Sequence, residues 1–281
     1  MHALEIKNVT KQYDGFCLDS VNLCLPRGCI MGLIGENGAG KTTLLHTILQ
    51  MRKKDSGTVT VFGQDADTDL CAVKENIGAV LDEVGFPDCL TALQVGRVLK
   101  TVYRNWDDSL FQSLLQRLAV PQNKMFKAFS RGMKMKLGIA AALSHHPKLL
   151  VLDEATNGLD PVAREEILEI LREFTLSGEN AVLISSHIVS DLEKICDYIA
   201  FLHTGKLLLC AEKDRLQEEY GMLQCSAEQL RTIDRSAVLG KRTSPYGVQA
   251  VVHKKALSDN MHVGAVNLEE LFLFMIRGEN E

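Results

Sequence analysis

The sequence predicts an α/β fold built on a parallel sheet, and two observations support this. The short apolar run 29–34 ends in a glycine-rich loop, and apolar residues then recur at helical spacing over 44–49. Two further short apolar runs, 149–152 and 181–185, flank another helical pattern over 167–174. Buried parallel strands joined by crossover helices are typical of such patterns.

The composition limits the class of protein. The chain has 281 residues, of which 46% are apolar and 24% charged, so we expect one large domain with at most a small appendage. The net charge of −5 disfavours a protein that binds nucleic acid through its phosphates. The most apolar runs, such as 139–143 and 272–276, are far shorter than a membrane span. Residues 1–8 have no signal-peptide core, and we therefore expect neither direct membrane insertion nor export.

The eight cysteines contain no CxxC pair and have no histidine-rich partner segment, so the sequence does not predict a zinc cluster. Several of them lie in apolar, strand-like stretches, Cys29 for example. We interpret them as reduced, small core residues of a cytosolic protein.

Other elements can be placed along the chain in order. Alternating or apolar stretches at 4–13, 21–25 and 58–62, with glycine turn signals beside them, predict a small antiparallel sheet. Residues 91–144 carry two apolar stripes at helical spacing and predict a mainly helical insertion. Trp106 lies between its first two helices, where we expect it to pack.

The pattern weakens after residue 205, and residues 216–264 are mixed. A last helix is predicted where Asn267 can cap it, Glu270 lies three residues on, and apolar residues form one face. We therefore divide the chain into residues 1–215 and a small C-terminal α+β extension, 216–281.

The glycine-rich loop carries the most specific motif. The segment Gly35-Glu36-Asn37-Gly38-Ala39-Gly40-Lys41-Thr42 fits GxxxxGK[ST] and lies between a predicted strand and a predicted helix. Backbone N–H groups of such a loop and the helix N-terminus surround phosphate groups. Lys41 would reach the β- and γ-phosphates, and Thr42 would offer its hydroxyl to Mg²⁺. A chance match is the alternative, and the strand–loop–helix context argues against it.

Two adjacent carboxylates, Asp153 and Glu154, end the apolar run 149–152. Solvated carboxylates at a strand end are common. Here a phosphate-binding loop lies upstream, and this favours a role for the two acids in phosphate chemistry. Asp153 would then hold Mg²⁺, and Glu154 would orient and deprotonate an attacking water.

Three more segments accompany these motifs. Ser130 is a good N-cap for a helix that follows, and Gly132 allows close backbone approach. Asp160 ends the segment Gly158-Leu159-Asp160, and His187 follows the apolar run 181–185. A lone histidine is usually structural, but one at the exit of a parallel strand is well placed to meet a ligand.

In order and spacing these elements resemble the ATP-binding subunit of an ABC transporter over residues 1–215. The resemblance implies a P-loop NTPase fold of the ABC ATPase type with antiparallel, helical and C-terminal parts. It implies that ATP and Mg²⁺ are the cofactors, that Lys41, Glu154 and His187 are catalytic, and that Thr42, Asp82 and Asp153 bind the metal. The nucleotide would contact Tyr13, Gly35, Glu36, Asn37, Gly38, Ala39, Gly40, Lys41, Thr42, Thr43, Ser130, Gly132 and Asp160, with Tyr13 stacking on adenine.

The chain departs from the family pattern at three places. The signature motif, usually LSGGQ, is Phe129-Ser130-Arg131-Gly132-Met133, although the serine and the second glycine remain. Ala155 replaces a usual proline, and Asp82 occupies the position of a usual glutamine. An acid can still bind a metal, but it adds negative charge near the phosphates.

The resemblance implies an ATP hydrolase that powers a separate membrane-spanning subunit. ATP would join two such chains head to tail, with Ser130 and Gly132 of one closing over the γ-phosphate of the other. We expect a second ATP-binding subunit, identical or related, and a multi-spanning membrane subunit docked near Asp82, so the protein would lie peripherally on the cytoplasmic face of the cell membrane. Asp82 and the C-terminal segment resemble the exporter branch for drugs, peptides or antimicrobials.

Two other functions are compatible with a phosphate-binding loop. A soluble ABC-type ATPase with a regulatory or remodelling role is the alternative, but such relatives normally carry two ATPase units or long coiled coils. A small-molecule kinase would need neither the segment 130–132 nor His187.

Overall fold

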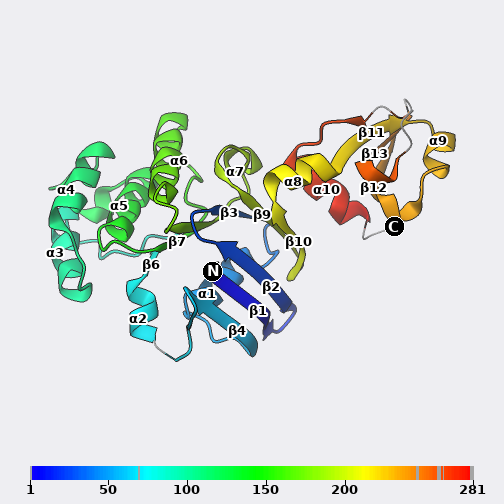
Figure 1. The fold of residues 1–281 in the computed structure, drawn as a ribbon. Coiled ribbons are helices and arrows are strands. Elements are labelled where there is room, and N and C mark those ends of the chain that lie inside the picture. The colour runs from blue at the N-terminus through cyan, green and yellow to red at the C-terminus, as the bar shows by residue number, and fades with distance from the viewer. Residues whose placement is uncertain (1, 69, 245–246, 258–260, 262, 279–281) are drawn as a thin grey trace.

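The computed structural model describes residues 2–68, 70–244, 247–257, 261 and 263–278. Within these residues the strands form three sheets of four, six and four strands. The six-stranded sheet lies in the middle, with a group of helices at one end and the C-terminal sheet at the other (Figure 1). The α/β class predicted from the sequence is confirmed.

The antiparallel sheet predicted near the N-terminus is present. Its spatial order is β2 (Phe16–Pro26), β1 (His2–Tyr13), β4 (Ser56–Val61) and β5 (Gln64–Asp65), and each neighbouring pair is antiparallel. Its buried side chains, Leu4 and Ile6 among them, pack in one cluster with residues of the central sheet. This packing fixes the β1–β2 turn beside the glycine-rich loop.

The central sheet carries the strands that position the functional residues. Its spatial order is β10 (Lys206–Glu212), β9 (Tyr198–His203), β3 (Ile30–Ile34), β8 (Ala181–Ser185), β7 (Leu149–Asp153) and β6 (Ile77–Val80). Neighbouring strands are parallel except β9 and β10. Every residue of β3, β7 and β8 is buried, which explains their continuous apolar runs. Their carboxyl ends meet at one edge of the sheet, where ligands bind in open α/β sheets.

Helices cover both faces of this sheet. On one face α1 (Lys41–Ile48) packs against alternate residues of β7 and β8, and on the other α6 (Pro161–Thr175) and α7 (Val189–Ile195) pack against the intervening residues. The short helix α2 (Leu70–Glu75) precedes β6. Covering both faces is what allows the strands to be wholly apolar.

The helices expected within residues 91–144 are also present. They are α3 (Ala92–Val102), α4 (Asp108–Arg117), the 3₁₀ turn η1 (Phe126–Ala128) and α5 (Arg131–Leu143). Thr91, Asp107 and Ser130 cap the three α-helices through side-chain oxygens. Trp106 packs on Phe111 with ring centroids 5.1 Å apart, as expected.

The C-terminal part forms its own sheet, in the order β12 (Val238–Ser244), β13 (Gly247–His253), β11 (Tyr220–Cys225) and β14 (Val263–Gly264). Its helical elements are α8 (Lys213–Glu219), α9 (Ala227–Arg231), η2 (Arg235–Ala237), η3 (Lys254–Ala256) and α10 (Leu268–Gly278). Asn267 caps α10 as predicted, since its Oδ1 accepts the N–H of Glu270 at 2.7 Å. Phe272 of α10 packs on Phe201 of β9 at 5.1 Å, which ties the C-terminal part to the central sheet. The division at residues 215 and 216 remains a prediction.

None of the helices in the described part of the chain combines the length and the apolar character that crossing a bilayer requires.

Candidate functional site

The glycine-rich loop, residues 35–42, joins β3 to α1 and is shaped by left-handed backbone. Gly38 and Gly40 have φ of 83° and 106°, values that side chains rarely permit. A Cβ on Gly40 would lie 2.6 Å from the ring of Phe16, so a larger residue there would have to displace that ring as well as adopt the left-handed backbone. Gly40 is also the N-cap of α1 and provides no side-chain acceptor. The helix therefore begins with N–H groups directed at an open loop, the arrangement that binds phosphates.

Lys41 is held in the loop by backbone oxygens. Its Nζ donates to the carbonyl of Gly35 at 2.7 Å and to that of Glu36 at 3.3 Å. The same Nζ lies 3.6 Å from a carboxylate oxygen of Glu154, and only 6% of Lys41 is exposed. The cation is thus fixed at the floor of the loop, where an anionic ligand would meet it with little solvent screening.

Asp153, at the end of β7, connects the loop to the sheet. One of its carboxylate oxygens accepts the hydroxyl hydrogen of Thr42 at 2.7 Å, and the other accepts that of Ser185 at 2.5 Å. Asp153 is only 1% exposed. The hydroxyl and carboxylate oxygens gathered here are hard ligands of the kind that Mg²⁺ prefers, so the residues present fit that ion. Sequence reasoning missed Ser185, although its position at the end of a strand beside β7 was a usable signal.

Glu154 follows in a strained conformation, with φ of 53°, a region seldom occupied by residues other than glycine. Its N–H is held by the carbonyl and the hydroxyl of Ser185, at 3.1 and 3.2 Å. Its carboxylate lies 2.6 Å from Nδ1 of His187 and 3.3 Å from the backbone N of that residue. Because a carboxylate only accepts, Nδ1 carries the hydrogen, and the imidazole orients the acid.

Several of these groups line a groove of about 890 Å³, while Asp153 lies behind the lining and meets it through Thr42. Predicted residues that line it are Glu36, Asn37, Gly38, Gly40, Lys41, Thr42, Thr43, Asp82, Glu154 and His187. It is also lined by four residues that sequence reasoning did not assign to the site, namely Gly15, Phe16, Arg131 and Asn157. The groove thus brings together segments that lie far apart in the sequence, at the carboxyl edge of the central sheet.

Asp82 and Arg131 form an ion pair across the groove. Asp82 follows β6 and Arg131 is the first residue of α5, so the pair joins the sheet to the helical segment. Arg131 also lies against the loop after β7, since a Cβ on Gly158 would contact its Cδ at 3.5 Å. Arg131 therefore offsets the negative charge that Asp82 brings to the groove. Both residues stand at positions where the chain departs from the family pattern described above.

Three predicted residues lie at the starts of helices and outside the groove lining of their own chain, and two of them are helix caps. Ser130 accepts the N–H of Met133 at 3.3 Å, and Asp160 accepts the N–H groups of Val162 and Ala163 at 3.1 and 3.0 Å. The pKa of Asp160 is lowered, mainly because its carboxylate accepts the backbone N–H of Ala163. Gly132 lies in the first turn of α5. The structure thus places Ser130 and Gly132 at the start of one helix, without bringing them to Lys41.

Tyr13, Gly35 and Ala39 also lie outside the groove lining. Tyr13 ends β1, is 38% exposed, and has the Nζ of Lys11 5.3 Å from its ring centroid. Phe16, its partner across the turn, is the aromatic residue that lines the groove. The turn spacing and the glycine at position 15 could have identified Phe16 as the residue directed at the loop.

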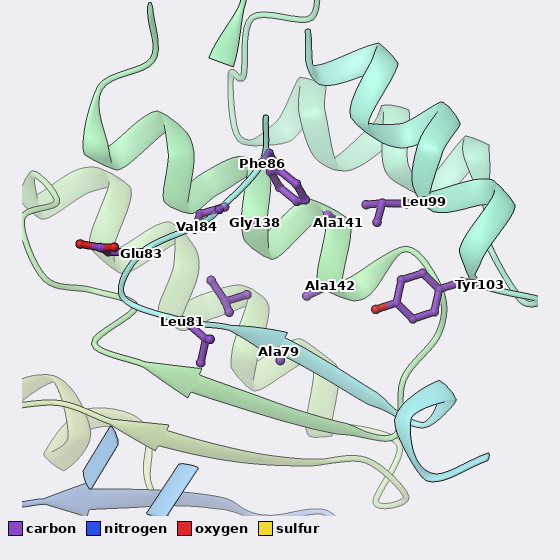
Figure 2. Close-up of a pocket in the computed structure, with 12 residues that line it drawn as sticks. Ala79, Leu81, Glu83, Val84, Phe86, Leu99, Tyr103, Gly138, Ala141 and Ala142 are labelled. Carbon is purple, nitrogen blue, oxygen red and sulfur yellow. The ribbon is translucent and has the colours of Figure 1, made fainter. Parts of the chain in front are cut away.

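A second hollow, of about 230 Å³, lies between the segment after β6 and the helices α3 and α5. Figure 2 shows Phe86 and Val84 from that segment, Leu99 from α3, Tyr103 directly after α3, and Ala142 from α5 around it. The ring of Tyr103 stacks on His145 at 3.9 Å. This hollow is mainly apolar and begins next to Asp82.

Comparison with known proteins gives consistent results. A family model described as ABC transporter matches residues 18–157. The bacitracin transport ATP-binding protein BcrA of Enterococcus faecalis is 36% identical over 74% of this chain and 68% of its own length. The lantibiotic transport ATP-binding protein SrtF of Streptococcus pyogenes is 37% identical over 75% of this chain and 91% of its own length.

The fold is similar to solved structures as well. A structure described as an ATP-binding subunit of an ABC transporter superposes with a TM-score of 0.71 at 25% identity, covering 76% of this chain and 92% of that one. The range matched by the family model, residues 18–157, includes the glycine-rich loop, Asp153 and Glu154.

Proposed function

This chain belongs to the ATP-binding proteins of the ABC transporter family, and from that premise we propose that it binds ATP with Mg²⁺ in the groove, hydrolyses ATP and powers a separate membrane-spanning subunit. ATP hydrolysis is general in this family. The observation that carries the proposal is the convergence of Lys41, the Thr42–Asp153 pair and the Glu154–His187 pair on one groove.

The loop residues would bind the phosphates. N–H groups of the loop and of the first turn of α1 would bind the β-phosphate, and Lys41 would exchange its carbonyl partners for β- and γ-phosphate oxygens. Thr42, Asp153 and Asp82 would hold Mg²⁺, which supplies Lewis-acid stabilisation of phosphate charge. Asp82 would have to share its carboxylate with Arg131, its present partner.

Glu154 would act as the general base that takes a proton from the attacking water. His187, already 2.6 Å from its carboxylate, would hold it in place and stabilise charge in the transition state. Glu154 is available for this because its backbone is fixed by Ser185, while its side chain faces the groove.

A second copy or a related chain would complete the site. Ser130 and Gly132 begin α5 yet lie outside the groove lining of their own chain, which fits a role toward a nucleotide held by a partner. In a head-to-tail pair they would close over the γ-phosphate, with Asp160 near the contact and Tyr13 against adenine. ATP would then favour the closed pair, and hydrolysis would favour its separation.

The membrane subunit would dock at the hollow beside Asp82 (Figure 2). Its apolar walls suit a short amphipathic helix laid into a groove. Because the two relatives named above are described as bacitracin and lantibiotic transport proteins, we propose that this chain belongs to the exporter branch for drugs, peptides or antimicrobials. It would therefore lie on the cytoplasmic face of the membrane through that subunit.

Glu154→Gln tests the proposal. The amide keeps the size of the side chain but cannot accept a proton, so ATP should still bind while hydrolysis falls about 100-fold or more. ATP should also drive the variant into a stable pair in gel filtration. Glu169→Gln, an exposed change on α6, is the matched control and should hydrolyse normally. Wild-type hydrolysis by Glu154→Gln would show that the assigned base is wrong.

A further inference from the structure

A group of potential metal ligands lies on the antiparallel sheet, away from the nucleotide groove. His2 and Glu5 on β1 and Cys24 on β2 place one ligand atom each within 4.8 Å of one another. None of the three lines the groove, and the proposed ATPase chemistry uses none of them. The three atoms are of different kinds, an imidazole nitrogen, a carboxylate oxygen and a thiol sulfur.

An irregularity in β1 brings these side chains together. In a regular strand residues 2 and 5 would point to opposite faces, because side chains alternate. The pairing of β1 with β2 shifts register between His2 and Leu4, and the consecutive residues Ala3 and Leu4 are both fully buried. This bulge turns His2 and Glu5 to the same outer face.

Strand pairing supplies the third ligand. Glu5 and Cys24 are direct partners across the β1–β2 ladder, with side chains on the outer face because Leu23 and Leu25 on either side of Cys24 are buried. The backbone hydrogen bonds of the sheet therefore hold the three residues in place before any ion arrives. Such preorganisation lowers the entropic cost of binding.

The mixture of ligands selects the ion. Mg²⁺ and Ca²⁺ take oxygen ligands, whereas one nitrogen, one oxygen and one sulfur suit a borderline-soft ion such as Zn²⁺. Ligand atoms of tetrahedral zinc lie roughly 3.5 Å apart, given metal–ligand bonds of about 2.0–2.3 Å, so small side-chain rotations from the present spacing suffice. We propose that His2, Glu5 and Cys24 form a zinc site with a fourth position for water. As the Zn–S bond forms, the thiol proton passes to solvent.

Lys7 competes with the ion. Its Nζ lies 2.9 Å from a carboxylate oxygen of Glu5, and its side chain is 61% exposed. A bound divalent cation would repel this ammonium group and replace it as the partner of the Glu5 carboxylate. Lys7→Gln should therefore bind the metal several-fold more tightly, an effect that a merely structural Glu5–Lys7 contact would not produce.

The test is a Co²⁺ titration of the full, reduced chain without nucleotide, because Co²⁺ bound to a thiolate absorbs strongly in the near ultraviolet and reports sulfur ligation directly. A single equivalent should bind, and Zn²⁺ should displace it. His2→Ala, Glu5→Gln and Cys24→Ser should each weaken binding by about 100-fold, at least the loss seen when residues that only support metal ligands are changed.

Cys89→Ser is the matched control, since Cys89 is another exposed thiol outside the group of ligands, and it should bind Co²⁺ like the wild type. Unchanged ATP binding by each variant would show that the chain is still folded. The proposal is overturned if the thiolate absorption is absent, if it persists in Cys24→Ser, or if His2→Ala binds as tightly as the wild type.

Discussion

Ser185→Ala should be unusually destabilising for the removal of a single hydroxyl. Ser185 is fully buried, and its hydroxyl donates to the carboxylate of Asp153 at 2.5 Å while accepting the N–H of Glu154 at 3.2 Å. Alanine removes both contacts. The N–H of Glu154 keeps the carbonyl of residue 185 at 3.1 Å, so the main loss is one hydrogen bond to a buried acid.

The magnitude follows from the charge of the acceptor. A hydrogen bond to an ionised group contributes about 1.5–3 kcal/mol, whereas one between neutral groups contributes about 0.5–1.5 kcal/mol. Asp153 retains the hydroxyl of Thr42 at 2.7 Å, so the carboxylate is not left without a partner. We therefore expect Ser185→Ala to lower the free energy of unfolding by about 2 kcal/mol.

Ser144→Ala is the matched control. Ser144 is equally buried, but its hydroxyl donates to a neutral acceptor, the carbonyl of Ala140, at 2.6 Å. Thermal unfolding of the nucleotide-free chain, followed by circular dichroism, measures the stability of both variants. The midpoint temperature should shift by about 2–4 °C per kcal/mol for a chain of this size. If Ser185→Ala lowers the free energy of unfolding no more than Ser144→Ala does, the hydrogen bond to the Asp153 carboxylate is no stronger than one to a neutral carbonyl, and the reasoning is refuted.

Three further outcomes are expected. Gly40→Ala should destabilise the nucleotide-free chain more than Gly38→Ala in urea unfolding, because both have left-handed backbone but only the first would clash with a neighbouring ring; equal losses would show that the clash is relieved. Burial lowers the pKa of His145 below its ordinary 6.5. Below that pH the unfolded chain binds a proton that the folded chain does not, so stability should fall as the pH drops below about 7. His145→Gln should reduce this loss of stability at low pH. An unchanged pH dependence of unfolding would show that His145 is not its source. Burial raises the pKa of Cys196, so iodoacetamide at about pH 8 should alkylate exposed Cys89 and spare Cys196; similar rates for both thiols would contradict it.

Much of the groove could be predicted because its chemistry is carried by short, contiguous segments. The loop 35–42 contains its own glycines, lysine and threonine, and its flanking apolar runs indicate a strand and a helix. Asp153 and Glu154 likewise end a run whose apolar character reflects burial on both faces. Such features depend on local backbone geometry and on burial, and both can be predicted from the types and spacing of neighbouring residues.

Contacts between segments that lie far apart in the sequence could not be predicted in this way. Which aromatic residue lines the groove, Phe16 rather than Tyr13, depends on the direction in which the β1–β2 turn packs against the loop. The ion pair of Asp82 with Arg131 spans 49 positions and exists because α5 begins beside the end of β6.

The amino-acid sequence by itself therefore determined the fold class, the phosphate-binding loop and the acidic strand end, since each is encoded by neighbouring residues. Only the tertiary structure decided which side chains meet across segments. Ser185 reaches Asp153 because parallel β7 and β8 pair these two residues in register, and His2 joins Glu5 and Cys24 because a bulge reverses one side chain. Register and packing direction are properties of the assembled sheet, set by many small contacts at once, and no single stretch of residues specifies them.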